Sequence, residues 1–528
     1  MKRIRPYNTE RKSFFWYKII PGIITVVILT SPLWTSLLGI YEALIIYLAF
    51  LATYILYKAV QHSIASVLGY KKMVRDKKRD WSKDLLKIDF DNLESKKDLP
   101  NDLSQIYHLF FYPIYKESYS DLKKGIESIV NQDYPYPKRI IFVAAVEERA
   151  GPEQKEIVKK LKKEYQDKVY GFWDYYHPEN IEGEIKGDAC SNLRWAARHA
   201  SKDLQSHNID SRHVIFTKAD ADTRFHKKFF SALTYTYITA DKRYQKFYSP
   251  AVIIYSNNIW KVPGLVRLFS MSLTLSIVAE WVYEKRLKQS FTCYSANFHL
   301  LERIDFWDPT TGAEDTYFYW NAFLHLNGDF QGECFFLPVT MDAVEGTDLL
   351  SSLTSLYKQQ LRWGWGVILM PIAIQGMLWN KKIPVSMKIS KFALLARIYN
   401  FTITMSTLLS FAMPVLNLIN NELEYSSIAY LLPKTVSYMM MASLLFQIPS
   451  KYYLWRYYGS PPKEKSLLFK IWWWGVEHFL MFINIWTYYL IPRLHAQYEV
   501  TLGKQRKKFF ISVEGRQKKI NSKSKTLP

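Results

Sequence analysis

Two aspartates, Asp220 and Asp222, lie directly beyond an apolar run, residues 213–218, that has the composition of a buried β-strand. Two carboxylates at positions i and i+2 beyond a strand can hold one hard divalent cation, because Mg²⁺ and Mn²⁺ prefer oxygen ligands and readily bridge to phosphate. In open α/β sheets, ligands bind beyond the carboxyl ends of the strands. The pair therefore predicts a site for Mg²⁺ or Mn²⁺, although acidic pairs are also common in loops that bind no metal.

A second acidic pair, Glu314 and Asp315, precedes an aromatic segment with helical character. Carboxylates in this position can simply stabilise the N-terminus of a helix. Asp315 can also act as a general base that removes the proton from an acceptor hydroxyl while the hydroxyl oxygen attacks. The two roles are compatible, and the sequence leaves both open.

Gln359, Arg362 and Trp363 are spaced so that they share one face of a helix. An arginine can stabilise a leaving diphosphate, and a tryptophan offers a flat surface on which a ring can stack. Apolar sequence follows directly, so an arginine and tryptophan anchor at a membrane interface is an equally good interpretation of these residues alone.

A fourth group, Tyr115 and Glu117, lies at the end of the buried-strand candidate at residues 106–115. A loop that carries a tyrosine and a glutamate at a strand end can receive a nucleotide base and its ribose. The alternative is that Pro113 merely marks the turn after the strand.

The elements that would position these groups alternate between strands and helices from about residue 103 to 344. This alternation predicts an α/β domain whose parallel sheet is covered by helices on both faces. The clearest candidates are strands at 106–115, 138–146 and 212–220, and helices at 121–132 and 151–166.

Apolar runs at residues 19–40 and 41–56 are each close to the length of about 20 residues that crosses a bilayer. The first has no clear small-x-small cleavage site and a second span follows it, so a hairpin with both ends in the cytoplasm is preferred to a signal peptide. Residues 71–102 form a charged connector. The moderately apolar segment 262–282 is expected to be a buried or interfacial helix.

Further apolar runs follow the predicted sheet domain, at residues 365–379, 392–419, 428–448 and 467–491. Three clear spans would place the basic tail outside, against the positive-inside tendency. Either the run at 365–379 also spans, or one of the later runs does not. We favour a cytoplasmic tail.

The formal net charge is +22, and 49% of the residues are hydrophobic. A basic excess can indicate nucleic-acid binding, but beside long apolar runs it is better explained by cytoplasmic loops and attraction to anionic membrane lipids. Cys190, Cys293 and Cys334 are far apart and form no paired motif, which suits a reducing cytoplasm. They are expected to be small core residues.

Taken in order, the strings PIYKE, SIVNQDYP, DAD, ED and QQLRW resemble family 2 glycosyltransferases, the inverting group with the GT-A fold. The membrane branch of that family includes the cellulose, chitin and hyaluronan synthases and ceramide glucosyltransferase. The segment YSANFHLLERIDFWDP is similar to the acceptor side of these enzymes. The resemblance runs from about Leu103 to Trp363, and the flanking apolar runs extend it to most of the chain.

The resemblance implies a nucleotide-sugar donor, expected to be UDP-linked. Tyr115 and Glu117 would bind its base and ribose. Glu147 would be the acid of the second strand, where the family more often has aspartate. Lys186 resembles the lysine near the diphosphate, with Asn192 shortly after it, in a segment that departs from the usual small-residue pattern.

The remaining roles also come from the resemblance. Asp220 and Asp222 would bind the metal and the diphosphate, and Asp315, next to Glu314, would be the catalytic base. The residues that border the acceptor and the diphosphate would be Gln359, Arg362 and Trp363.

The expected fold is thus a GT-A-like nucleotide-sugar-binding α/β domain flanked by transmembrane helices, in a multi-pass protein of the cell membrane with its catalytic domain in the cytoplasm. The predicted units are an N-terminal hairpin, a connector, the catalytic domain, the C-terminal helices and a basic tail, at residues 1–70, 71–102, 103–363, 364–493 and 494–528.

The acceptor is expected to be a lipid or a growing glycan. Two alternatives stay within this fold, namely a catalytically inactive membrane scaffold and a processive polysaccharide synthase with a translocation channel. A transporter is disfavoured because its spans should show internal repeats, and none is found. A nucleic-acid binder would not require this ordered set of motifs.

Overall fold

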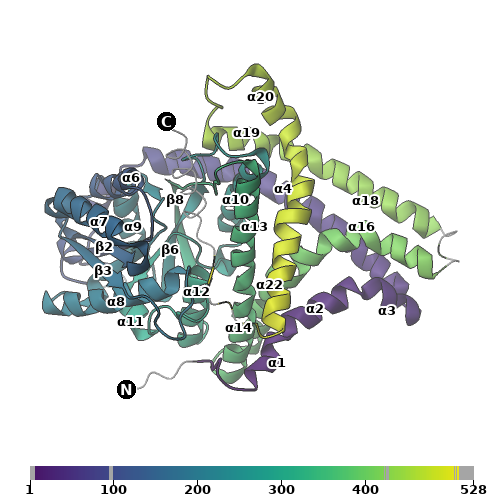
Figure 1. Ribbon diagram of the computed structural model, residues 1–528, viewed down its shortest axis with the longest axis horizontal. Coiled ribbons are helices and arrows are strands. Elements are labelled where there is room, and N and C mark those ends of the chain that lie inside the picture. The colour runs from purple at the N-terminus through teal and green to yellow at the C-terminus, as the bar shows by residue number, and fades with distance from the viewer. Residues whose placement is uncertain are drawn as a thin grey trace, which may run out of the picture.

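The computed structural model describes residues 6–93, 99–420, 423, 427–504, 506 and 508–509. Residues 1–5 of the basic N-terminus and most of the predicted tail lie outside the described residues. A sheet domain occupies one end of the molecule, and long helices project from it at the other (Figure 1).

The sheet domain is built on eight strands in the order β3-β2-β1-β4-β7-β6-β8-β5. Three of the strands, β1, β2 and β4, confirm those predicted from buried apolar runs. The strands are β1 (Tyr107–Ile114), β2 (Ile140–Glu147), β3 (Gly171–His177), β4 (Val214–Lys218), β5 (Arg224–Phe225), β6 (Lys246–Ile254), β7 (Tyr294–Asn297) and β8 (Gln331–Thr340).

The sheet is mixed, so the prediction of a parallel sheet was right for one half and wrong for the other. Strands β3, β2, β1 and β4 run parallel, whereas β7 pairs antiparallel with both β4 and β6. Strand β8 is parallel to β6 and antiparallel to β5. The sequence did not reveal β7 because four residues, YSAN, are too short to show a period.

Helices cover the sheet, and those predicted at 121–132 and 151–166 are confirmed as α6 and α7. In α6 the Ser118 hydroxyl accepts the Asp121 backbone N–H at 3.1 Å, and Leu122, Ile126 and Ile129 face the core. The helices that connect these strands are α6 (Tyr119–Val130), α7 (Pro152–Tyr165), α8 (Ala189–Ser206), α9 (Phe229–Thr239), α11 (Phe298–Arg303) and α12 (Glu314–His325).

Within the described residues, five helices are long and apolar enough to cross a membrane, or six if one bent pair is counted as a span. The bent pair joins Phe14–Leu29 to Ser31–Leu37 at 62°. Helix α4 (Tyr41–Lys78) is continuous from the second apolar run into the charged segment, so the boundary predicted at residue 70 falls inside a helix. The later candidates include Val385–Ile419 and Ala429–Tyr458.

The five candidates differ in what surrounds them. In the most apolar stretch of Leu349–Trp379, 78% is buried within the protein, and in α10 (Gly264–Tyr283) 61% is buried. The same measure is 22% for α4 and 6% for Ala429–Tyr458. Helix α10 packs against β6 and α4, so it is mostly a helix of the protein interior.

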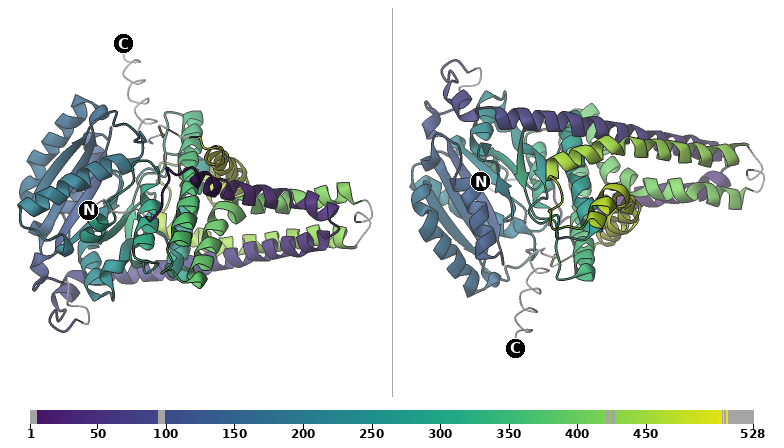
Figure 2. Two further views of the ribbon diagram at one scale, coloured as in Figure 1. Left: turned by 90° about the horizontal axis from the view of Figure 1, so that it is seen from below. Right: turned by 90° about the horizontal axis from the view of Figure 1, so that it is seen from above.

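The C-terminal run from residue 467 to 501 consists of short helices with π and 3₁₀ turns between them, and it is not among the five candidate spans. Its last part, α22 (Ile491–Thr501), lies beside α13 (Leu349–Gly364) and runs across the direction of α4, α16 (Thr402–Ile419) and α18 (Ser427–Leu445) (Figures 1 and 2).

One buried ion pair joins this C-terminal run to the sheet domain. The Arg267 guanidinium of α10 donates two hydrogen bonds to the Glu477 carboxylate, at 2.8 and 2.9 Å. The two side chains are 4% and 1% exposed. Removal of one partner would leave the other charge buried without compensation.

We expect Glu477→Leu to lower the free energy of unfolding by about 3–5 kcal/mol, because it strands the Arg267 guanidinium. The double variant Arg267→Met/Glu477→Leu should recover most of this loss, because both charges are gone. The measurement is the denaturant-induced unfolding of the purified proteins in detergent. A double variant no more stable than Glu477→Leu would show that packing, not charge, governs this contact.

Candidate active site

A cavity of about 690 Å³ opens beyond the carboxyl ends of β1, β2 and β4, the position expected for a ligand site in an α/β sheet. The structure brings nearly all of the predicted site residues to its walls. Those that line it are Tyr115, Glu117, Glu147, Asp220, Asp222, Glu314, Asp315, Gln359, Arg362 and Trp363.

At the β1 and β2 side, the carboxylate of Glu117 accepts the backbone N–H of Tyr115 at 2.7 Å. Arg149, which the sequence analysis did not single out, donates to Glu147 at 2.9 Å and lies over the Tyr115 ring at 4.4 Å. His177 also faces Glu147, at 3.6 Å. The predicted base-binding residues are therefore held in place by a guanidinium two positions after Glu147.

Lys186 does not line the cavity. Its side chain is exposed and its ammonium hydrogen-bonds to the side chain of Asn180. Asn192, by contrast, lines the cavity and is buried, and its side-chain N–H donates to the Ala145 carbonyl at 2.7 Å, which ties α8 to β2.

Phe509, after α22, packs against Gly187 and Gly312, two glycines that line the cavity. Its backbone N–H donates to the Lys186 carbonyl at 2.7 Å, and its ring is 2% exposed. The ring packs so closely on Gly312 that a Cβ there would lie 2.5 Å from it, and a Cβ on Gly187 would lie 2.3 Å from the Phe509 carbonyl oxygen. Both glycines also have positive φ, so a larger residue at either position would be disfavoured by its backbone conformation as well as by the close contact with Phe509.

The two aspartates of the DAD motif lie at the end of β4 with oxygen-rich surroundings. Thr292 donates its hydroxyl to Asp220 at 2.6 Å, and the backbone N–H of Asp342 donates to Asp222 at 3.2 Å. Asp342 lines the same cavity. This set of carboxylates is of the kind that Mg²⁺ and Mn²⁺ prefer, so the residues present fit such an ion.

A buried lysine that the sequence analysis did not single out joins the two acidic motifs. Lys218 ends β4 and its side chain is 0% exposed. Its ammonium lies 2.9 Å from Asp220 Oδ1, 3.0 Å from Glu314 Oε1 and 2.9 Å from Asp315 Oδ1. A weaker contact of 3.4 Å reaches the Thr292 carbonyl.

This arrangement separates the pKa values of the neighbouring acids. For Asp315, burial and the charges of Glu314 and Asp220 outweigh Lys218 and raise the pKa to about 7. For Glu314, burial acts in the same direction, but Lys218 and Arg362 outweigh it and lower the pKa to about 2. Both acids lie in the first turn of α12, where the helix dipole favours negative charge.

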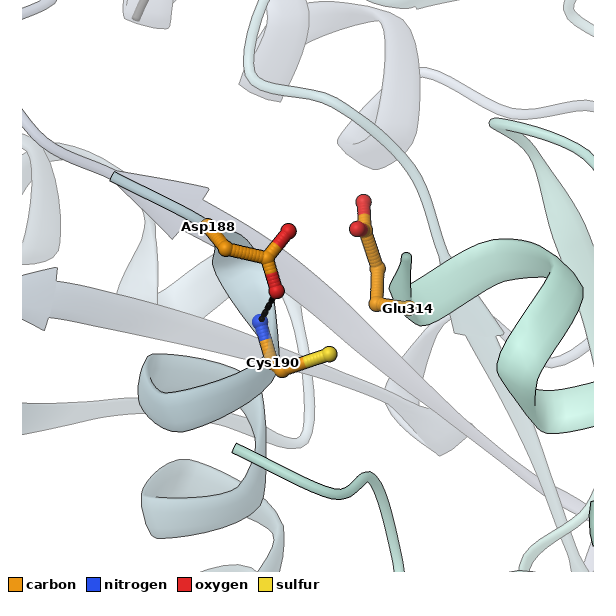
Figure 3. Close-up of side chains that lie close together, drawn as sticks. All are labelled: Asp188, Cys190 and Glu314. Carbon is orange, nitrogen blue, oxygen red and sulfur yellow. Dashed lines mark hydrogen bonds between the residues drawn. The ribbon is translucent and has the colours of Figure 1, made fainter. Parts of the chain in front are cut away.

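Glu314 also belongs to a second cluster, which it forms with Asp188 and Cys190. The potential ligand atoms of these three residues are within 4.8 Å of one another (Figure 3). Asp188 caps α8 by accepting the Cys190 N–H at 3.1 Å. Burial and the charge of Glu314 raise the pKa of Asp188 to about 8, and burial also raises the pKa of the Cys190 thiol. We interpret the cluster as an acid pair that keeps a proton, because a protonated thiol is a poor metal ligand.

We expect Asp188→Asn to reduce the pH dependence of stability. The raised pKa means that protonated Asp188 stabilises the fold at low pH and that this contribution is lost as pH rises from about 4 to about 8. Asparagine carries no such proton, so its melting temperature should exceed that of the wild type increasingly from pH 5 to pH 9. Parallel curves for the two proteins would contradict the acid-pair interpretation.

Comparison with known proteins gives a limited result. No protein-family model matches the chain, and no curated protein matches it. Among solved structures, it is similar to the mannosyltransferase PcManGT from Pyrobaculum calidifontis in complex with GDP-Man and Mn²⁺, at 14% identity over 73% of this chain and 99% of that one, with a TM-score of 0.38.

It is also similar to residues 1–349 of TarS from S. aureus, at 13% identity over 67% of this chain and 92% of that one, with a TM-score of 0.34. The TarS complex with UDP-GlcNAc gives 14% identity, coverages of 66% and 91%, and a TM-score of 0.34. The residues and distances of this chain are therefore the basis for the function proposed next.

Proposed function

We propose that the protein is an inverting glycosyltransferase that moves a sugar from a nucleotide-sugar, expected to be UDP-linked, to a lipid or a growing glycan at a membrane. The observation that carries this proposal is the convergence of the two acidic motifs in one cavity, with Asp220 and Asp315 on the same ammonium. Arg362 and Trp363 reach that cavity from α13.

In the proposed reaction, the acceptor oxygen bonds to the anomeric carbon while the bond from that carbon to the diphosphate breaks. Asp315 takes the proton of the acceptor hydroxyl, and attack from the face opposite the diphosphate inverts the anomeric configuration. The Arg362 guanidinium stabilises the departing diphosphate. A bound Mg²⁺ or Mn²⁺, held by Asp220 and Asp222, would supply further neutralisation of that charge.

Tyr115 and Glu117 would bind the base and ribose, with Glu147 and Arg149 beside them. Because its guanidinium lies over the Tyr115 ring, Arg149 fixes the orientation of the aromatic surface available to a base. The donor would then extend from the β1 and β2 strand ends towards Asp220, with the transferred sugar near Asp315.

A second cavity of about 400 Å³ supports an acceptor path towards the membrane helices. It shares Phe291, Thr316, Trp363 and Tyr399 with the first cavity and extends between α10 and the C-terminal run. We propose that the acceptor approaches Asp315 through it. A processive polysaccharide synthase stays the second candidate, because such a passage can also receive a growing chain.

For membrane placement, we propose that the bent N-terminal pair, α4, Val385–Ile419 and Ala429–Tyr458 cross the bilayer. The last three have low burial, which suits contact with lipid, whereas α10 and Leu349–Trp379 are mostly covered by protein. Four crossings return both ends to the side of the sheet domain. The basic termini make that side the cytoplasm of a cell-membrane protein.

An inactive scaffold of the same fold would not require this set of charged residues. Lys218 is fully buried and Glu314 and Asp315 are mostly buried beside it, and burying such charges costs stability, which supports a functional reason for keeping them. The enzyme is therefore the better proposal.

We expect Asp315→Asn to lower sugar transfer by at least about 100-fold, which is the usual contribution of a general base, while nucleotide binding is kept. In the wild type, the rate should rise with pH through about 7, because the base must be deprotonated. Transfer is measured with radiolabelled nucleotide-sugars and membrane extract as acceptor, and the product is identified by mass.

The matched control is Asp329→Asn, a surface acid paired with Lys242 outside the cavity, which should leave transfer unchanged. Turnover of Asp315→Asn near the wild-type rate would rule out Asp315 as the base.

We expect Asp222→Ala to abolish the part of nucleotide binding that depends on Mn²⁺ or Mg²⁺, because one of the two proposed carboxylate ligands is removed. Titration of a nucleoside diphosphate with and without Mn²⁺ measures this contribution. Equal enhancement by Mn²⁺ in the variant and the wild type would disprove the metal site at the DAD motif.

A further inference from the structure

The Lys218 ammonium contacts carboxylates that have two different proposed roles, cation binding and proton abstraction. Asp220 is a proposed ligand of the divalent cation, and Asp315 is the proposed base. The third contact, Glu314, belongs to neither task directly. A side chain with 0% exposure cannot turn its charge towards water, so the Lys218 ammonium can shift only among these three carboxylates.

A divalent cation at Asp220 and the Lys218 ammonium would share one carboxylate. Two positive charges at that distance repel, and each weakens the attraction of Asp220 for the other. The ammonium has an alternative, because Glu314 and Asp315 can hold it without Asp220. A lysine suits this situation better than an arginine, since its charge is compact and its stem is flexible.

We propose that Lys218 is a positioning residue that couples occupancy of the cation site to the state of the catalytic base. This inference rests on the proposed function. Without a cation, the Lys218 ammonium is shared between Asp220 Oδ1 and Asp315 Oδ1. Cation binding at Asp220 shifts the ammonium off that carboxylate and onto Glu314 and Asp315, which fixes the position of the Asp315 carboxylate.

The coupling has to be reciprocal, because binding free energies are linked. If a cation at Asp220 weakens the Lys218 contact, then Lys218 must weaken binding of the cation. A lysine that served merely as a counter-ion for the folded state would repel the cation in the same way, but its removal would leave kcat unchanged once the cation site is saturated. The two roles therefore differ in whether removal of the lysine lowers kcat at saturating Mn²⁺.

The test is the affinity of the full-length protein in detergent for Mn²⁺ alone, measured by the electron paramagnetic resonance signal of free Mn²⁺. We expect Lys218→Met to bind Mn²⁺ about tenfold more tightly than the wild type, a coupling of ordinary size. Lys246→Met is the matched control, because Lys246 is also buried and ion-paired on the same sheet but its partners, Asp241 and Glu333, belong to neither acidic motif. Its Mn²⁺ affinity should equal that of the wild type.

Kinetics supply a second readout. In Lys218→Met, we expect kcat for sugar transfer to fall by about tenfold or more while the KM for the nucleotide-sugar does not rise, because the base loses its positioning contact and the donor site does not. Lys218→Arg should restore part of kcat, since the positive charge returns. If Lys218→Met does not fold, Lys218→Gln keeps donors for the carboxylates without the charge, and the same tighter Mn²⁺ binding is expected.

Unchanged or weaker Mn²⁺ binding in the folded neutral variants would overturn the inference. Its failure is distinguishable from that of the proposed function. A wild type that binds no Mn²⁺ even with a nucleoside diphosphate would refute the metal site itself. A wild type that binds Mn²⁺ with the nucleotide, while the Lys218 variants match it with and without nucleotide, would refute the coupling alone.

Discussion

A single buried ammonium allows several carboxylates to occupy one cavity. Asp220 and the adjacent pair Glu314 and Asp315 come from separate parts of the chain, and without a cation between them these carboxylates would repel one another. Lys218 offsets that repulsion from the last position of β4. At Glu314 the charges of Lys218 and Arg362 outweigh burial and lower the pKa to about 2, whereas at Asp315 burial and the neighbouring acids outweigh Lys218 and raise the pKa to about 7. A pKa near 7 suits the proposed base, which must both take up and release a proton.

Sheet topology determines why these groups meet. Strand β4 lies between the parallel half of the sheet, through β1, and the mixed half, through the antiparallel β7. The DAD motif therefore leaves the sheet where the two halves join, and α12 begins beside it with Glu314 and Asp315 in its first turn. The DAD motif and the proposed base thus depend on different halves of one sheet, and Lys218 contacts both.

Much of this site could be predicted from sequence, because its residues follow recognisable elements. Asp220 and Asp222 come after a buried strand, and Gln359, Arg362 and Trp363 share a helical face, so their meeting in one cavity follows from the fold. Lys218 could not be found in this way, since a lysine at a strand end ordinarily reaches water and no local pattern shows that acids from α12 will cover it. Asp188 was hidden for the same reason, because its partner Glu314 is distant in sequence.

The membrane helices show a related limit of sequence analysis. Hydropathy measures how apolar a helix is but not what covers it. Helices α10 and α4 are therefore both candidate spans, although α10 is packed against β6 and α4 is largely uncovered. The apolar run at 467–491 lies across the long helices, and the ion pair between Arg267 and Glu477 ties it to α10. That crossing run and α10 both line the second cavity, together with Leu394, Arg397, Ile398 and Ile403. The proposed acceptor path therefore depends on this run crossing the long helices instead of lying along them.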